Sequence, residues 1–187
     1  VDTFFIGMMG DVNQLAAANL GFPFFMITMA MGGVIGTGAS SVISRFIGMK
    51  KMKEAGEVVG LSFILAAMMG IAFTAVALFF LDPVIALRGA RDGVVIPTRE
   101  YLFPLIVGAV FIMMNFSVGV TLRAEGAAAD MTVGMIIGSV VNIILDPVMI
   151  FALDWGIAGA AWATVIGNLA GLLFYLWCSA KKSILNV

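Results

Sequence analysis

The sequence contains no histidine and only one cysteine, and both shortages exclude kinds of chemistry. Without histidine, the chain lacks the commonest general base, the commonest transition-metal ligand and the usual side chain that titrates near neutral pH. A single cysteine, Cys178, excludes a disulfide within the chain and gives no basis for a thiolate metal site. Any binding chemistry must therefore come from carboxylates, amides and hydroxyls. We predict no cofactor and no enzymatic activity.

Charge is scarce as well. Charged residues make up 11% of the 187 residues, whereas hydrophobic residues make up 62%. A water-soluble domain of this size would need far more charge on its surface. The formal net charge of −1 provides no concentrated basic face for phosphate groups, which argues against a nucleic-acid partner. The composition indicates a protein of the lipid bilayer.

Long apolar stretches recur along the chain between short polar segments. Because a transmembrane helix needs about 20 apolar residues, the first ten residues can form only the end of a span. We predict an all-α, polytopic membrane helical bundle of five full spans plus the end of a truncated first span. Pro97 suits a helix start, and Trp155 is expected to be an interfacial tryptophan in the short connection before the last span. The last span ends near Tyr175 and Trp177. The predicted segments are 1–10, 15–46, 56–81, 101–122, 131–153 and 157–179, and 88–100 is the longest polar connection.

Positive charge is unevenly divided between the two ends of these spans. By the positive-inside rule, the loops containing Lys50–Lys53 and Lys181–Lys182 are predicted to be cytoplasmic. Arg88, Arg91 and Arg99 then lie on the outer side. The cytoplasmic group holds seven of the ten Lys and Arg residues: Arg45, Lys50, Lys51, Lys53, Arg123, Lys181 and Lys182.

Within the apolar run 131–153, one stretch carries an amide, a carboxylate and a proline. An ionisable side chain near the middle of a bilayer costs about 2.5–3.5 kcal/mol, so Asp146 is expected to face a cavity, a partner or an ion. Asn142 lies four residues earlier and therefore on the same helix face. Pro147 cannot donate a backbone hydrogen bond, so carbonyls near Ile143 are expected to face the same guest. The pattern predicts a polar pocket inside a membrane helix.

Other polar side chains fall at intramembrane positions. Asp2 is expected at a depth similar to that of Asn142 and Asp146, in the outer half of the membrane. Two carboxylates with neighbouring amide and hydroxyl oxygens are suitable ligands for a hard cation such as Na⁺. The same pair would hold a proton, since two acids close together in a low dielectric cannot both ionise without cost. The remaining members, Asn115, Thr164 and Asn168, could equally serve as interhelical hydrogen bonds.

Small residues are concentrated in the second predicted segment, at Gly32, Gly33, Gly36 and Gly38. Small residues at helical spacing allow helix backbones to approach closely. We interpret these glycines as packing positions, because nothing that flanks them is ionisable before Arg45.

Several motifs together resemble the multidrug and toxic compound extrusion (MATE) transporters, within a larger group that includes polysaccharide and lipid flippases. The similarity extends over essentially the whole chain. The two motifs that are most specific in order and spacing are Asn142-Ile143-Ile144-Leu145-Asp146-Pro147 with Phe151, and Gly156-Ile157-Ala158-Gly159-Ala160-Ala161 with Thr164. Supporting motifs are Val1-Asp2-Thr3 with Gly7, and Ile43-Ser44-Arg45 with Gly48.

The resemblance implies a twelve-helix antiporter of two six-helix lobes, in which inward Na⁺ or H⁺ flow drives export of cationic or amphipathic compounds. The chain corresponds to the amino-terminal lobe, with most of the first helix and the carboxy-terminal lobe absent. It would reside in the plasma (inner) membrane of a prokaryote, and this lobe alone should not transport. The residues that the resemblance assigns to the cation site are Asp2, Asn142, Asp146 and Thr164, with Asn115 as a nearby support.

Three other interpretations were considered. A flippase for lipid-linked sugars would be expected to line its cavity with several arginines, whereas the arginines here fall at loops. An intramembrane aspartyl protease would also use two aspartates, but its Tyr-Asp and Gly-x-Gly-Asp signatures are missing. A purely structural membrane module would leave Asp146 unexplained.

Overall fold

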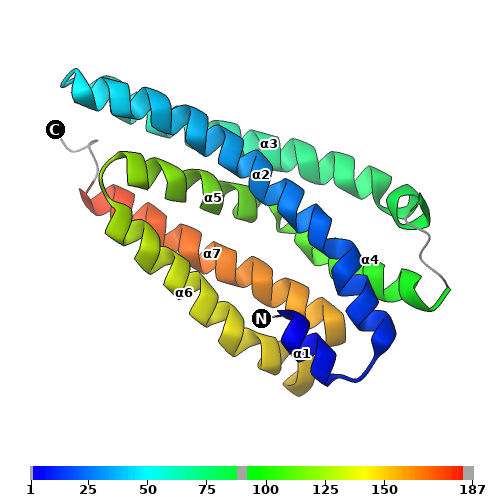
Figure 1. The fold of residues 1–187 in the computed structure, drawn as a ribbon. Helices are drawn as coiled ribbons and strands as arrows, with labels where there is room; N and C mark the ends of the chain where they lie inside the picture. Colours follow the sequence, from blue (N-terminus) through cyan, green and yellow to red (C-terminus); the bar gives the residue numbers. More distant parts are fainter. Residues whose placement is uncertain (1, 88–91, 183–187) are drawn as a thin grey trace.

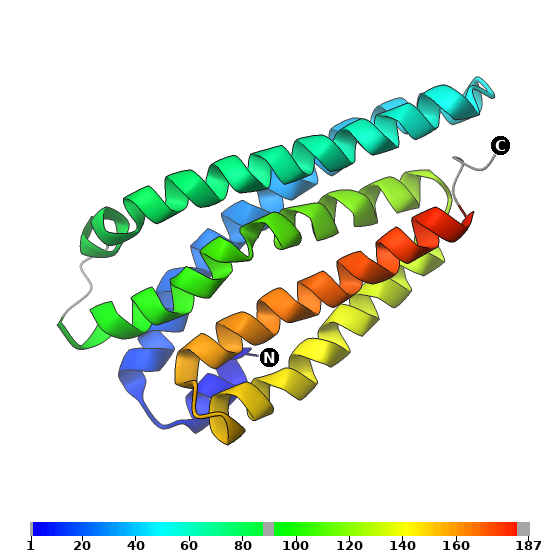
Figure 2. The ribbon, with the colours of Figure 1, turned by 180° about the vertical axis from the view of Figure 1, so that it is seen from behind.

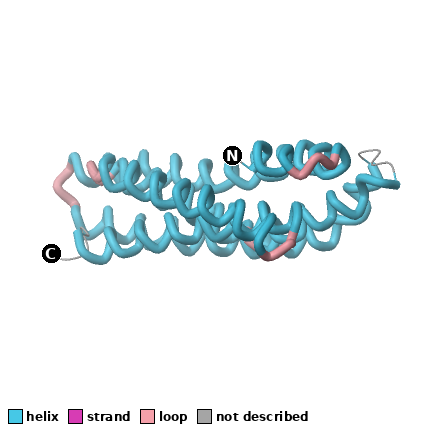
Figure 3. Tube along the Cα trace, turned by 90° about the horizontal axis from the view of Figure 1, so that it is seen from below, coloured by secondary structure: helices cyan, strands magenta, loops and turns pink. Residues whose placement is uncertain are grey.

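The computed structural model describes residues 2–87 and 92–182, and every regular element within them is helical (Figure 3). Four helices are long and apolar enough to cross a membrane, or five when the bent pair α4 and α5 is counted as one span. The predicted all-α membrane bundle is thereby confirmed. The elements are α1 (Asp2–Met8), α2 (Val12–Gly48), α3 (Met52–Leu87), α4 (Asp92–Val107), α5 (Ala109–Ala124), α6 (Ala128–Pro147), the π-helix η1 (Val148–Ala152) and α7 (Gly156–Lys182).

The helices divide into two groups joined by α5. The long helices α2 and α3 run side by side, and α6 and α7 form the other group (Figures 1 and 2). Among all pairs, α2 packs most extensively on α5, and α6 on α7. The short helix α1 contacts α2, α6 and α7. One end of the bundle is formed by the α2–α3 turn, the α5–α6 turn and the end of α7, so Lys50, Arg123 and Lys181 lie at the same end. Arg88 and Arg91 lie outside the described residues.

The predicted span 101–122 is covered by α4 and α5 together, and the structure differs from the prediction at its beginning. Helix α4 starts at Asp92, so most of the predicted polar connection 88–100 is helical and Pro97 lies inside α4. Packing overrides the helix-start preference of proline here. Leu102 is buried against Leu81 and Ile85 of α3, and these contacts hold the early turns of α4 in place.

The helix path then bends by 51° between α4 and α5. The bend falls at Gly108, where an added Cβ would collide with the Val165 side chain of α7. Across the bundle, the Thr74 hydroxyl of α3 donates a hydrogen bond of 2.9 Å to the Ile106 carbonyl oxygen. Neighbouring helices therefore fix the bend, which explains why the local sequence did not predict it.

Helix α2 approaches α5 closely along its glycines. A Cβ at Gly32 would lie 2.6 Å from the Met113 carbonyl oxygen, and one at Gly36 would lie 3.0 Å from the Ser117 carbonyl oxygen. The packing interpretation is confirmed for these two glycines. Gly33 and Gly38 face open space instead.

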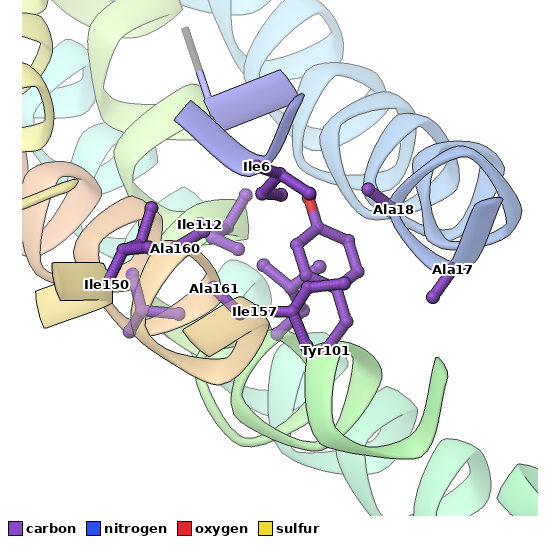
Figure 4. Close-up of a cluster of buried hydrophobic side chains, with 11 residues drawn as sticks. Ile6, Ala17, Ala18, Tyr101, Ile112, Ile150, Ile157, Ala160 and Ala161 are labelled. Atoms are coloured by element: carbon purple, nitrogen blue, oxygen red, sulfur yellow. The ribbon is translucent and has the colours of Figure 1, made fainter. Parts of the chain in front are cut away.

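A buried apolar cluster holds α1 against the bundle (Figure 4). Ile6 of α1 is fully buried and packs with Ile112 of α5, Ile150 of η1 and Ile157 of α7. The Tyr101 ring of α4 belongs to the same cluster, with its hydroxyl directed toward Ile6. Although α1 is short, its position is thus determined by several helices.

Candidate cation site between α1, α6 and α7

Asp146 lies near the end of α6 and has no solvent exposure at all. The Asn142 side-chain amide, one turn earlier on the same face, donates to Asp146 Oδ1 at 3.3 Å. Asp146 Oδ2 is buried without a hydrogen-bond partner in the described part of the chain. The structure therefore shows the Asn142 and Asp146 pair that the four-residue spacing predicts, with one carboxylate oxygen still able to accept a proton or bind an ion.

Thr164 of α7 connects this pair to α1. Its hydroxyl donates to Asp2 Oδ2 at 2.5 Å, and its oxygen lies 3.4 Å from the donating Nδ2 of Asn142. A hydroxyl can donate one hydrogen bond while accepting others, so Thr164 can serve both neighbours at once. The four residues of the predicted site thus lie in one continuous set of hydrogen bonds drawn from three helices.

The hydrogen bonds continue along α7 to α5. The Asn168 amide donates to the Thr164 carbonyl oxygen at 2.9 Å, and the Asn115 amide donates to Asn168 Oδ1 at 3.0 Å. The predicted alternative of interhelical hydrogen bonding is confirmed for Asn115 and Asn168. Asn115 Oδ1 is buried without a partner among the described residues. Asn115 is therefore linked to the four predicted ligands through Asn168.

Close contact between α6 and α7 makes this arrangement possible. A Cβ at Gly167 would lie 2.7 Å from the Gly138 carbonyl oxygen and 3.1 Å from the Asn142 Cβ. Nearer the end of α6, a Cβ at Gly159 would lie 2.7 Å from the Met149 carbonyl oxygen. Glycine on α7 lets the two backbones approach, and the polar side chains of the facing helices come within hydrogen-bonding distance as a result.

Pro147 does not end its helix, which continues directly into η1. The wider turn of η1 includes a hydrogen bond of 2.9 Å from the Leu153 N–H to the Val148 carbonyl oxygen. Single π-helical turns often occur at functional sites. Because Pro147 has no N–H, it cannot donate to the Ile143 carbonyl, and the participation of that carbonyl in ion binding stays a prediction.

The hydrogen-bonded set borders a cavity of about 450 Å³. Its polar lining includes Asp2, Asn142, Thr164 and Asn168, whereas Asp146 lies outside the lining. The described residues contain no group of three His, Cys, Asp or Glu side chains that could hold a metal ion. The available ligands are carboxylate, amide and hydroxyl oxygens. The apolar lining includes Phe22, Phe25, Phe116, Met131 and Met135.

Two tyrosines, Tyr101 and Tyr175, also border the cavity, and the sequence alone did not predict this position for either of them. Tyr175 is 1% exposed, and its hydroxyl donates to the Met131 carbonyl oxygen at 2.8 Å. Its ring fills the space left by Gly134 on α6 and lies against Gly119 on α5. A glycine on each facing helix was the available signal, but only the structure shows which side chain those glycines accommodate.

The fold and the site thus define a membrane protein whose apolar helices enclose connected polar side chains beside a cavity. Comparison with known proteins identifies the family. The MatE family model matches residues 1–148, and the chain belongs to this family. The family resemblance inferred from the sequence is thereby confirmed.

Individual relatives agree with this assignment. The chain is 34% identical over 183 residues to the multidrug export protein MepA of Staphylococcus aureus strain MRSA252, and 31% identical to MepA of Staphylococcus saprophyticus. A solved structure of MATE in the bent conformation is 34% identical and superposes with a TM-score of 0.92, covering 97% of this chain and 40% of that one. A transporter of the MOP superfamily from Pyrococcus furiosus has a TM-score of 0.91 at 34% identity, with the same coverage of both chains. The alignment to MepA of strain MRSA252 spans 98% of this chain but only 41% of the length of that protein.

Proposed function

We propose that this chain forms the amino-terminal lobe of an antiporter that exports cationic or amphipathic compounds in exchange for Na⁺ or H⁺. Membership of the MatE family supports transport, and the relatives named as multidrug export proteins support the substrate class. The chain spans 41% of the length of MepA of Staphylococcus aureus strain MRSA252, so a carboxy-terminal lobe is the expected partner within the same protein.

The observation that carries the proposal is the buried Asp146 carboxylate, which lies beside the Asp2 carboxyl and has one oxygen without a hydrogen-bond donor among the described residues. A charged carboxylate in an apolar interior is unfavourable unless a cation or a proton compensates it. Asp2 supplies a second carboxylate, joined to the first through Thr164 and Asn142. These four side chains provide the oxygen ligands that Na⁺ prefers, and either carboxylate can accept a proton.

Ion binding would change the local hydrogen bonds in a defined way. With Na⁺ bound, the Thr164 oxygen would face the ion as a ligand, and the Asn142 amide would turn its own oxygen toward it. A proton on Asp146 would neutralise the same charge without a change of ligands. Either ion removes the cost of the buried charge, so the loaded and unloaded lobes would favour different conformations.

The cavity supports an organic cation as the exported compound. Phe22, Phe25 and Phe116 present aromatic surface that can attract a cation, and Met131 and Met135 can adapt to different shapes. Asp2 both lines this cavity and bonds to Thr164. A cationic compound and the coupling ion would therefore compete for one negative charge, which is the requirement for exchange.

The flippase alternative gains no support from the cavity, since no lysine or arginine is among the described residues that line it. We further infer that the bundle end carrying Lys50, Arg123 and Lys181 faces the cytoplasm, with the protein in the prokaryotic plasma membrane. The candidate cation site then lies toward the outer side.

The direct test uses the full-length protein in sealed vesicles. Movement of a fluorescent organic cation would be followed while a Na⁺ gradient or a pH gradient is imposed separately. We expect at least one gradient to drive the cation in the opposite direction, and the effective gradient would identify the coupling ion. Equal cation movement with and without both gradients would contradict the proposal.

A further inference from the structure

A second cavity, of about 310 Å³, lies between α2, α3 and α4, away from the candidate cation site. Its lining is almost entirely aliphatic and aromatic. The Phe24 and Phe73 rings are 5.3 Å apart between centroids and form one wall. This cavity shares no lining residue with the cavity beside Asp2.

The lining changes from buried to exposed along the cavity. Ile85, Thr98 and Leu102 at one side are at most 4% exposed, whereas Val76 and Phe80 at the other are 57% and 49% exposed. The exposed side is formed by α3 together with Ile27 of α2, and α3 carries large apolar side chains on its outer surface along its length. The cavity therefore opens sideways onto the exposed apolar surface of the bundle.

The cavity offers nothing to a polar occupant. The hydroxyl of its single polar lining residue, Thr98, donates to the Val94 carbonyl oxygen at 2.8 Å. A water molecule needs two or more polar partners to remain in a cavity, and this lining holds no charged side chain that would compensate the charge of an organic cation. Hydrocarbon is thus the chemical class that fits. Inside a bilayer, dispersion contacts with the cavity walls favour filling this space with an acyl chain.

A cationic side chain adjoins a lining residue in the sequence of α4. Arg99 follows Thr98 directly, and its side chain is 63% exposed. One of its nitrogens, Nε, lies 3.6 Å from Asp82 Oδ1, and a guanidinium has further N–H groups that can bind a phosphate. α4 begins at the bundle end opposite Lys50 and Lys181, so Arg99 lies near the outer interface in the orientation inferred above. We propose that the cavity holds one acyl chain of an outer-leaflet phospholipid whose phosphate group binds Arg99.

The first test counts retained lipids by native mass spectrometry of the full-length protein in detergent with added phosphatidylglycerol. Ala77→Phe fills the cavity, whereas the matched variant Ala75→Phe adds the same ring at an exposed position of the same helix. We expect wild type and Ala75→Phe to retain a phospholipid that Ala77→Phe loses. Equal retention by all three proteins would overturn the proposal.

The second test separates the phosphate contact from a structural ion pair. Arg99→Gln should abolish the preference for phosphatidylglycerol over uncharged diacylglycerol, whereas Asp82→Asn should keep it. Equal loss of preference in both variants would overturn the role of Arg99.

A third test needs no substitution, and so it remains valid if Ala77→Phe does not fold. A phospholipid with a photoreactive group in its acyl chain should label segments 20–27 and 73–85 in the wild-type protein. Labelling spread evenly over α3, or labelling displaced by an exported cation, would overturn the proposal. None of these readouts requires transport, so their failure would be distinct from failure of the proposed antiport.

Discussion

Helices α3 and α7 show two ways in which one bundle treats polar side chains. Within the most apolar segment of each helix, 17% of the residues of α3 are buried, compared with 50% of those of α7. The buried Ser62 hydroxyl of α3 donates to a carbonyl oxygen of its own helix. By contrast, the side chains of Thr164, Asn168 and Tyr175 on α7 bond to α1, α5 and α6. Polar groups shared between helices, rather than polar groups as such, distinguish the candidate site from the exposed part of the bundle.

A large effect is expected from removal of the Thr164 hydroxyl of α7, and a small one from removal of the Thr37 hydroxyl of α2. Thr164→Ala removes the group that connects Asp2 and Asn142, and hydrogen bonds to charged groups contribute about 1.5–3 kcal/mol. We expect Na⁺ affinity of the full-length protein to fall by about tenfold or more, and proton coupling to suffer less. Thr37→Ala is the control, because the Thr37 hydroxyl bonds only to carbonyls of its own helix. Radioactive Na⁺ binding measures both, and equal losses would contradict a ligand role for Thr164.

Alanine substitution of a glycine should lower the stability on α7 and raise it on α3. Gly167→Ala places a Cβ 2.7 Å from the Gly138 carbonyl oxygen, and such overpacking destabilises by about 1–3 kcal/mol. Gly60→Ala on α3 meets nothing within 4 Å and should stabilise the helix by about 0.5–1 kcal/mol. Thermal unfolding in detergent would measure both variants. Similar shifts in the same direction would contradict the close packing of α6 on α7.

A smaller effect is expected where α3 does bond to another helix. Thr74→Val removes the hydrogen bond to the Ile106 carbonyl oxygen at the bend, and interhelical bonds in membranes contribute about 0.6 kcal/mol. We expect a small decrease in the thermal unfolding midpoint of Thr74→Val. Ser62→Ala should show a smaller decrease, because it loses only a hydrogen bond within its own helix. An unchanged midpoint in Thr74→Val would show that α7 packing alone fixes the bend.

The smallest effect should occur outside the membrane-spanning segments, at Glu125 between α5 and α6. Burial raises the pKa of the Glu125 carboxyl above its usual value. The folded protein therefore holds this proton more tightly than the unfolded chain does. Stability should fall as pH rises from the unfolded pKa through the folded one. Glu125→Gln should remove this decrease in the unfolding midpoint, the exposed Glu57→Gln should not, and identical pH profiles for wild type and Glu125→Gln would contradict the expectation.

The sequence predicted the helical bundle because long apolar runs and short polar loops are local features. It also predicted that Asn142 and Asp146 share a face, because a spacing of four residues fixes this on any helix. The bend at Gly108 and the helical start at Asp92 depend on Val165, Thr74 and Leu81 in other helices, and no local pattern reports such contacts. The order of the spans predicted a similar membrane depth for Asp2 and Asn142, and resemblance to a family was needed to assign Asp2 and Thr164 to one site with Asn142.

The central claim is that Asp146 binds the coupling ion. Its most direct test compares Asp146→Asn with Asp130→Asn in the full-length protein, because both aspartates lie on α6, about 24 Å apart along the helix. Ion-gradient-driven efflux of a fluorescent cation from vesicles should disappear in Asp146→Asn and persist in Asp130→Asn, with both proteins folded. Efflux at the wild-type rate in Asp146→Asn would contradict the account.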